Sequence, residues 1–347
     1  MKVTVQSKAG ITTFECSEGE NLLYAGLKAG HALPYECGTG TCGTCRARVM
    51  DGDVDLAWKE APGLAFVKRE KSEVLLCQTH CRSDTTVRVP TPVGAIGDGL
   101  PVPATFAGRI GEVRRLTHDV VQFEVVLDRS MSFLAGQFVA MRCAAVEGAR
   151  AYSMVNYAKE TDRLVFVVKR KPGGKFSDWL FDTDVTGSPL DVFGPLGRAT
   201  FRPEENKNFV CIAGGSGVAG MMSIAAHATR NGYLSHNRGH VFFGVRTLAD
   251  CFYTAEFADY VRRSNGGLEV TVALSHEAAP NERHPDFPEI RLASGFVHEV
   301  AARSMQGKFD NMVGFVAGPP PMVDGALRML IIEARLPAQF IRYDKFG

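Results

Sequence analysis

The stretch Cys37-Gly-Thr-Gly-Thr-Cys42-Gly-Thr-Cys45, with a further cysteine at Cys77, decides the fold of the N-terminal part of this chain. Its spacing, C-x4-C-x2-C with a distant single cysteine, is the plant-type arrangement of [2Fe–2S] ligands. The three glycines between the cysteines permit tight backbone turns and let N–H groups approach the sulfurs. The sequence therefore predicts that this cluster is bound by Cys37, Cys42, Cys45 and Cys77.

Three alternatives remain open at the cysteine stretch. Structural zinc also takes four thiolates, but it usually does so through two C-x2-C pairs, and only one such pair is present. A Rieske centre needs two histidine ligands, and the paired Cys–His pattern is missing around His80. Cys81, four residues after Cys77, is an alternative fourth ligand. The spacing favours the plant-type cluster on Cys77.

Composition sets the broad class. The chain has 347 residues, 45% hydrophobic and 22% charged, with a formal net charge of +1, which favours two or three ordered domains and no nucleic-acid partner. Nine cysteines, an odd count without a secretory signal, favour a reducing, cytoplasmic location. The uncharged stretch 209–226 holds four glycines and is better explained as a strand, a turn and a helix start than as a membrane span.

The pattern of expected strands, helices and Gly/Pro-rich turns changes along the chain and predicts three domains. Short alternating strands and one helix surround the cysteines in residues 1–90, and a Pro/Gly-rich linker follows at 91–104. Residues 105–203 show regularly spaced strands with Gly/Pro turns, which predicts a small antiparallel barrel. Residues 204–347 alternate between strands and helices, which predicts a parallel, doubly wound sheet.

Two glycine-rich turns indicate phosphate binding. Gly214-Gly-Ser-Gly217 follows an apolar strand and precedes a helix, where backbone amides face an anion. Pro172-Gly-Gly-Lys-Phe-Ser177 shows the same strand–glycine–helix order. Each also fits a plain structural reading, the first as a helix cap and the second as a hairpin turn with Ser177 as the N-cap.

The order of these motifs resembles that of the NADH-dependent reductase components of bacterial oxygenases, and most closely the reductases of toluene-type diiron monooxygenases. The resemblance covers essentially the whole chain. It implies a multidomain α+β protein with an N-terminal β-grasp [2Fe–2S] ferredoxin, an antiparallel β-barrel FAD domain and a Rossmann-like α/β domain for NAD(P)H.

The family binds its flavin with an Arg-x-Tyr-Ser motif, which is Arg150-Ala151-Tyr152-Ser153 here. The resemblance implies that Arg150 faces the FAD phosphates, that Tyr152 packs on the isoalloxazine, and that Ser153 acts catalytically near N5. The second turn becomes another clamp on the pyrophosphate, through Gly173, Gly174, Lys175 and Ser177.

The nicotinamide nucleotide is assigned by the same resemblance. The family motif Gly-Gly-x-Gly-x-x-Pro is present as Gly214, Gly215, Ser216 and Gly217, with Gly220 in the proline position. The segment containing Arg246 and Asp250 resembles the part that reads the adenosine ribose, and a carboxylate there favours NADH over NADPH. The resemblance further implies a nicotinamide pocket at Gly318, Pro319 and Met322, after Ala317 where the family often has Cys, and a C-terminal Phe346 that shields the flavin.

We therefore expect an enzyme that takes hydride from NADH to FAD and passes single electrons through the cluster. The expected acceptor is an oxygenase hydroxylase or ferredoxin component in an aromatic or alkene oxygenase system. The protein itself is expected to be a monomer without membrane or nucleic-acid partners. The Pro/Gly linker suggests that the ferredoxin domain swings between flavin and partner. Two alternatives are the same path feeding a deoxysugar dehydratase and a non-catalytic redox module.

Overall fold

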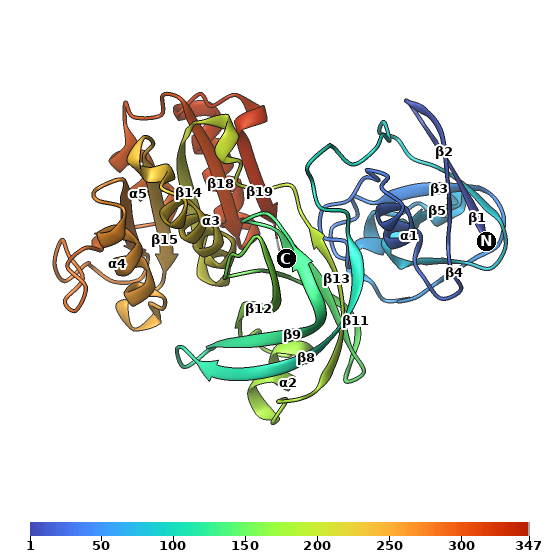
Figure 1. The fold of residues 1–347 in the computed structure, drawn as a ribbon, viewed down its shortest axis with the longest axis horizontal. Coiled ribbons are helices and arrows are strands. Elements are labelled where there is room, and N and C mark those ends of the chain that lie inside the picture. Colours follow the sequence, from blue (N-terminus) through green and yellow to red (C-terminus); the bar gives the residue numbers. More distant parts are fainter. Residues whose placement is uncertain (346–347) are drawn as a thin grey trace.

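The structure, a computed structural model, describes residues 1–345. They form three units in chain order, each built around one main sheet, and the first unit also holds a small two-stranded sheet. Figure 1 shows the first unit in blue at one end of the molecule, the second in green below the centre, and the third in yellow to red at the other end. No helix within residues 1–345 is both long and apolar enough to cross a membrane.

The first unit is a five-stranded sheet in the order β2-β1-β7-β3-β5, with β1 and β7 parallel and the other pairs antiparallel. Asn21 caps its helix α1 by accepting a hydrogen bond from the Tyr24 N–H at 2.8 Å. The strands and helix anticipated before the cysteines are confirmed. The elements are β1 (Lys2–Ser7), β2 (Gly10–Glu15), α1 (Leu22–Lys28), β3 (Arg46–Asp51), β4 (Val54–Leu56), β5 (Glu73–Leu75), β6 (Thr79–Cys81) and β7 (Thr85–Arg88).

The second unit is a six-stranded antiparallel sheet in the order β11-β10-β13-β8-β9-β12. Buried and accessible residues alternate along β9, as expected for a sheet with one face on a core. The order begins at β11 and ends at β12, so the expected barrel is an open half-barrel. Its elements are β8 (Ala104–Arg115), β9 (Val120–Ser132), β10 (Phe138–Cys143), β11 (Val146–Ser153), β12 (Glu160–Lys169), α2 (Lys175–Asp182) and β13 (Pro189–Leu196).

The third unit is a parallel six-stranded sheet in the order β17-β16-β15-β14-β18-β19. The chain leaves the central strand β14 toward β15 on one side and returns to β18 on the other, so the crevice for a ligand opens at the carboxyl ends of β14 and β18. The elements are β14 (Asn208–Gly214), α3 (Val218–Arg230), β15 (Gly239–Val245), α4 (Thr254–Arg263), β16 (Leu268–Leu274), β17 (Arg291–Ser294), α5 (Val297–Met305), β18 (Met312–Gly318), α6 (Pro320–Arg328) and β19 (Ile341–Lys345).

Side chains from the first and second units pack together. Tyr24 of α1 stacks on Phe193 of β13 with ring centroids 3.8 Å apart, and the Tyr35 hydroxyl accepts a hydrogen bond from the Gly197 N–H at 3.1 Å. One buried apolar cluster contains residues from both sheets. The cysteine-bearing unit therefore lies directly against the half-barrel.

The segment between these two units is partly held by the first. The Ala32 N–H donates to the Gly94 carbonyl at 2.8 Å, and the Ile96 N–H donates to the Gly30 carbonyl at 2.7 Å. Residues 93–96 thus extend the first unit. Any swing of the first unit relative to the second has to take place about the residues after Ile96.

Candidate functional site

The cysteine loop brings four sulfurs together as two pairs. Sγ of Cys45 lies 3.3 Å from Sγ of Cys77, and a hydrogen bond with Cys42 lowers the pKa of the Cys37 thiol to about 4. The loop can wrap this tightly because Gly38, Gly40 and Gly43 have φ values of +68°, +90° and +75°, which other residues rarely adopt. The predicted ligands are therefore assembled.

The pairing suits two metal ions better than one. Within residues 1–345, the only three or more Cys, His, Asp or Glu residues with ligand atoms all within 4.8 Å of one another are His118, Asp119 and Asp250. The four cysteines do not converge on one point in that way, as tetrahedral zinc would require. Two thiolates for each iron is the arrangement of a [2Fe–2S] cluster.

The sulfurs also receive hydrogen bonds of the kind that tune an iron–sulfur potential. The Thr39 N–H donates to Sγ of Cys37 at 3.4 Å, and the Thr44 N–H donates to Sγ of Cys42 at 3.5 Å. Nε2 of Gln78 donates to Sγ of Cys77 at 3.6 Å. The sequence placed glycine and threonine around the cysteines, but it did not reveal the role of Gln78.

Cys81, the alternative fourth ligand, is occupied elsewhere. Its thiol is hydrogen-bonded to Cys16, which lowers the pKa of Cys81 to about 7 and raises that of Cys16. Both side chains are 1% exposed, and Cys81 ends strand β6. Cys77 faces Cys45 instead, which favours Cys77 as the ligand.

We expect Cys81→Ser to keep the cluster, because this side chain pairs with Cys16 and not with the four-sulfur group. Purified variant protein should show the visible absorbance and circular dichroism of the wild-type cluster, with an iron content within about 20% of it. Loss of the cluster in this variant, with the rest of the protein folded, would make Cys81 a ligand.

A cavity of about 530 Å³ lies between the cysteine loop and the half-barrel, within the size range of cofactor pockets. It brings together segments from all three units. The cysteine-bearing unit supplies Cys37, Thr39, Thr41, Trp58, Glu60 and Pro62. The half-barrel supplies Glu147, Arg150, Ala151, Tyr152, Val168, Lys169, Lys171, Gly173, Gly174, Lys175, Phe176 and Ser177, and the nucleotide unit supplies Ser216.

The basic wall of this cavity fits the pyrophosphate of FAD. Arg150, Lys171 and Lys175 all line it, and so do Gly174, the N-cap of α2, and the first residues of that helix. Ser177 is not the N-cap. Its hydroxyl accepts a hydrogen bond from the Lys171 N–H at 3.1 Å and donates to the Gly174 carbonyl at 2.9 Å, which locks the turn.

The aromatic part of the flavin motif sits at the end of β11. Tyr152 lines the cavity and packs against Phe176 with ring centroids 5.3 Å apart, while burial raises the pKa of its hydroxyl. Ser153, the next residue, lies at the first turn of α3, where a Cβ on Gly220 would be 3.9 Å from Cβ of Ser153. Phe346, predicted to shield the flavin, lies outside the described residues.

The two nucleotide motifs meet at the carboxyl ends of β14 and β18. A Cβ on Gly217 would lie 2.5 Å from the Ala317 carbonyl oxygen, and one on Gly214 would lie 3.2 Å from Cε of Met322 and 3.3 Å from Cδ of Pro319. Gly215 adopts φ +54° and Gly318 adopts φ +150°. This close approach requires glycine, and the adjoining Ser216 lines the flavin cavity.

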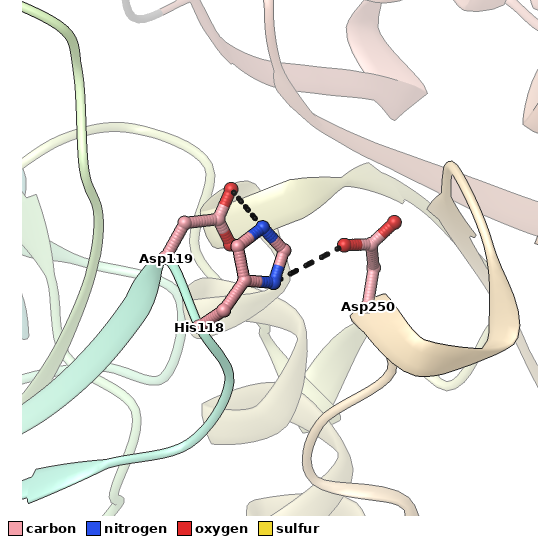
Figure 2. A group of neighbouring side chains, drawn as sticks. All are labelled: His118, Asp119 and Asp250. Carbon is pink, nitrogen blue, oxygen red and sulfur yellow. Dashed lines mark ion pairs between the residues drawn. The ribbon is translucent and has the colours of Figure 1, made fainter.

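Asp250 follows β15 at the same edge of the sheet, beyond the exposed Arg246. One of its carboxylate oxygens accepts hydrogen bonds from the N–H and hydroxyl of Thr247, at 3.0 and 2.9 Å. The other faces Nδ1 of His118 at 3.9 Å, and Nε2 of His118 faces Asp119 at 3.7 Å (Figure 2). Because Nζ of Lys169 also lies 2.9 Å from Asp119, a network of polar and charged side chains joins the half-barrel to the nucleotide unit.

Asp344 is a buried carboxyl where the three units meet. It lines a cleft of about 300 Å³ together with Tyr35 and Glu36 from the first unit and Arg198 from the second. Burial, with a smaller contribution from the charge of Glu36, raises its pKa from 3.8 to about 7. The folded protein therefore binds a proton here more tightly than the unfolded chain does.

We expect Asp344→Asn to stabilise the protein at pH 8. Since the folded pKa is raised to about 7, the wild type loses stability as pH rises from about 4 to 7, by up to about 4 kcal/mol. The gap in denaturation midpoint between variant and wild type should shrink from pH 8 to pH 5. The exposed Asp324→Asn serves as the control, and a gap that stays constant with pH would contradict the assignment.

Four cysteines brought together by a loop and a following turn, a basic and aromatic cavity and a parallel sheet with glycine-rich turns are the features of an iron–sulfur flavoprotein oxidoreductase. Family models match each unit: the 2Fe-2S iron-sulfur cluster binding domain at residues 4–82, the oxidoreductase FAD-binding domain at 107–201 and the oxidoreductase NAD-binding domain at 211–328. The chain belongs to the family of ferredoxin–NAD(P) reductase components of oxygenase systems.

Curated and structural relatives span the whole chain. The ferredoxin–NAD(+) reductase component of the alkene monooxygenase system of Xanthobacter autotrophicus is 32% identical, over 96% of this chain and 98% of its own. The xylene/toluene monooxygenase electron transfer component of Pseudomonas putida is 31% identical, over 92% and 86%. A solved ferredoxin reductase in carbazole 1,9a-dioxygenase superposes with a TM-score of 0.82 at 29% identity, covering 100% and 99%.

Several residues of the flavin cavity were not anticipated from the sequence. Trp58, Glu60 and Lys171 line it, yet they belong to no motif. Lys171 could have been found by its place directly before the Pro172 turn. Trp58 could not, because it lies in a different unit, about 90 residues before the flavin motif.

Proposed function

We propose that this protein takes a hydride from NADH and delivers single electrons through its cluster to an oxygenase component. When bound, FAD accepts two electrons together and releases them singly, which a one-electron [2Fe–2S] cluster requires. The chain itself binds and orients the groups. Arg150, Lys175 and the α2 N-terminus hold the flavin phosphates, Tyr152 packs on the ring, and Ser153 sits at its edge.

One observation carries this proposal: a single cavity has a cluster ligand on one wall and the flavin motif on the other. Cys37 and Tyr152 both line it, so electrons can pass from flavin to cluster without a large domain movement. Ser216, in the nucleotide turn, lines the same cavity and supports a nicotinamide arriving from the third unit.

The choice of NADH rests on the carboxylate at Asp250. In our proposal its oxygen facing His118 reads the 2′-hydroxyl of the adenosine ribose, and a 2′-phosphate would be repelled. Arg246 lies in the same segment. The nicotinamide ring would lie against Gly318, Pro319 and Met322. Phe346 is expected to shield the flavin until the nicotinamide binds.

The acceptor is proposed to be an oxygenase hydroxylase or a ferredoxin, because relatives carry names such as alkene monooxygenase and xylene/toluene monooxygenase reductase. We further propose a monomer, and a cytoplasmic location with which nine cysteines free of disulfides among the described residues are consistent. The proposed domains are 1–90, 105–203 and 204–347 with a linker at 91–104. One main sheet in each supports three units, although hydrogen bonds of Gly94 and Ile96 attach the start of the proposed linker to the first unit.

The test is an acceptor series with purified protein loaded with cluster and FAD. NADH should support reduction of ferricyanide and of cytochrome c, with kcat/KM at least about tenfold above that for NADPH. Reconstitution with candidate hydroxylase and ferredoxin components then identifies the acceptor. Failure to reduce ferricyanide and cytochrome c with both nucleotides would reject the enzyme and leave a passive redox module.

A further inference from the structure

Trp58 belongs to the cysteine-bearing unit but reaches the flavin cavity. It lies two residues after β4, in a loop, and is half-buried against the half-barrel. It lines the cavity together with its neighbour Glu60. The flavin site is therefore composite, with part of its wall contributed by the ferredoxin unit.

The half-barrel is shaped to receive this indole. Gly148 of β11 has φ +75°, and a Cβ there would lie 2.9 Å from Cε3 and 3.2 Å from Cδ2 of Trp58. The ring thus packs directly on the backbone of β11, two residues before the flavin motif begins. Any larger residue at position 148 would push the indole away.

The same indole contacts the arginine assigned to the FAD phosphates. The guanidinium carbon of Arg150 lies 5.3 Å from the centroid of a Trp58 ring, within cation–π range. Nη1 of Arg150 donates to the carbonyls of Glu147 and Ala149, at 3.2 and 3.0 Å. Backbone on one side and an aromatic face on the other therefore hold the guanidinium at the cavity wall.

The loop that carries Trp58 is also tied to the cluster. The Ala57 N–H donates to the Gln78 carbonyl at 2.9 Å, and the Gln78 side chain donates to Sγ of Cys77. A short path of non-covalent contacts thus leads from Arg150 through Trp58 and its loop to Gln78, and from there to the expected cluster ligand Cys77. Order at the flavin phosphates and order around the cluster depend on the same loop.

We propose that Trp58 is a positioning residue of the FAD site: it holds Arg150 toward the flavin pyrophosphate, so that FAD binding and the seating of the ferredoxin unit reinforce each other. This inference rests on the proposed function only in assigning the cavity to FAD. It predicts that the loop 57–62 becomes more ordered when FAD binds, although it lies outside the flavin-binding unit.

The experiment measures FAD affinity by titrating FAD-free, cluster-loaded protein and following the quenching of flavin fluorescence. Trp58→Ala should weaken FAD binding about 3- to 30-fold, the range for losing a partly buried cation–π contact. Trp58→Phe keeps a ring and should stay within about threefold of wild type. The matched control is Ile11→Ala, which truncates an exposed large apolar side chain of the same unit that does not line the cavity; it should bind FAD as wild type does.

A second readout needs no activity. Hydrogen exchange of the 57–62 peptide should slow on adding FAD to the wild type, by about threefold or more, and change little in Trp58→Ala. Full FAD affinity in Trp58→Ala, or wild-type exchange that ignores FAD, would overturn the inference while leaving the proposed function intact. A wild-type protein that does not bind FAD would instead reject the proposed function.

Discussion

Replacing Cys77 with serine is expected to reduce NADH-dependent cytochrome c reduction by at least about 100-fold, while ferricyanide reduction stays near the wild-type rate. Cys77 is 2% exposed and lies 3.3 Å from Cys45, so it is placed to complete one of the two cysteine pairs. Without it we expect the cluster to be lost. Cytochrome c, which accepts single electrons from the cluster, would then no longer be reduced. Ferricyanide can still take electrons from the flavin directly.

The separation of the two activities is the informative part of this experiment. Cys81→Ser, four residues away, removes a buried thiol without touching the four-sulfur group and should keep both activities. Cluster absorbance reports directly on the loss in Cys77→Ser. If that variant retained both the cluster spectrum and cytochrome c reduction, the ligand set would be wrong. If it lost both activities, a folding defect would have to be separated by measuring FAD content.

Gly217→Ala is expected to lower kcat/KM for NADH by about 10- to 100-fold, whether through KM or through kcat. FAD and the cluster should be retained. A Cβ at this position would lie 2.5 Å from the Ala317 carbonyl oxygen and 2.8 Å from Cα of Gly318. Since both are backbone atoms, the phosphate turn and the end of β18 must separate, and the nicotinamide crevice lies between them. Steady-state kinetics with NADH gives the measurement.

The matched control for this substitution lies one helical turn away. At Gly220 a Cβ would meet nothing closer than the Gly136 carbonyl oxygen at 3.6 Å, an ordinary contact. Gly220→Ala should therefore leave KM unchanged and stabilise α3 by about 0.5–1 kcal/mol. Equal kinetic losses in both variants would show that general disturbance of α3, and not the turn at Gly217, governs NADH use.

The elements and order of the fold were largely predictable because hydrophobic periodicity and glycine turns are local signals. The strands expected within 105–203 became β8 to β13, and the strand, turn and helix start expected in 209–226 became β14, the glycine turn and α3. The barrel was less predictable. Whether β11 and β12 close a ring depends on contacts between strands far apart in sequence, and the sheet is in fact open. The alternative that made Ser177 the N-cap of the following helix was wrong, since Gly174 is the N-cap of α2.

The sequence by itself determined the cofactor chemistry of this protein. The spacing of Cys37, Cys42 and Cys45 is a property of one short loop, and it favours a [2Fe–2S] site over zinc before any packing is known. Only the tertiary structure decided how the cluster site, the flavin site and the nucleotide site are placed next to one another. The approach of Cys77 to Cys45, the contact of Trp58 with Arg150 and the shared cavity all depend on which distant segments the packed sheets bring together, and no local pattern encodes that.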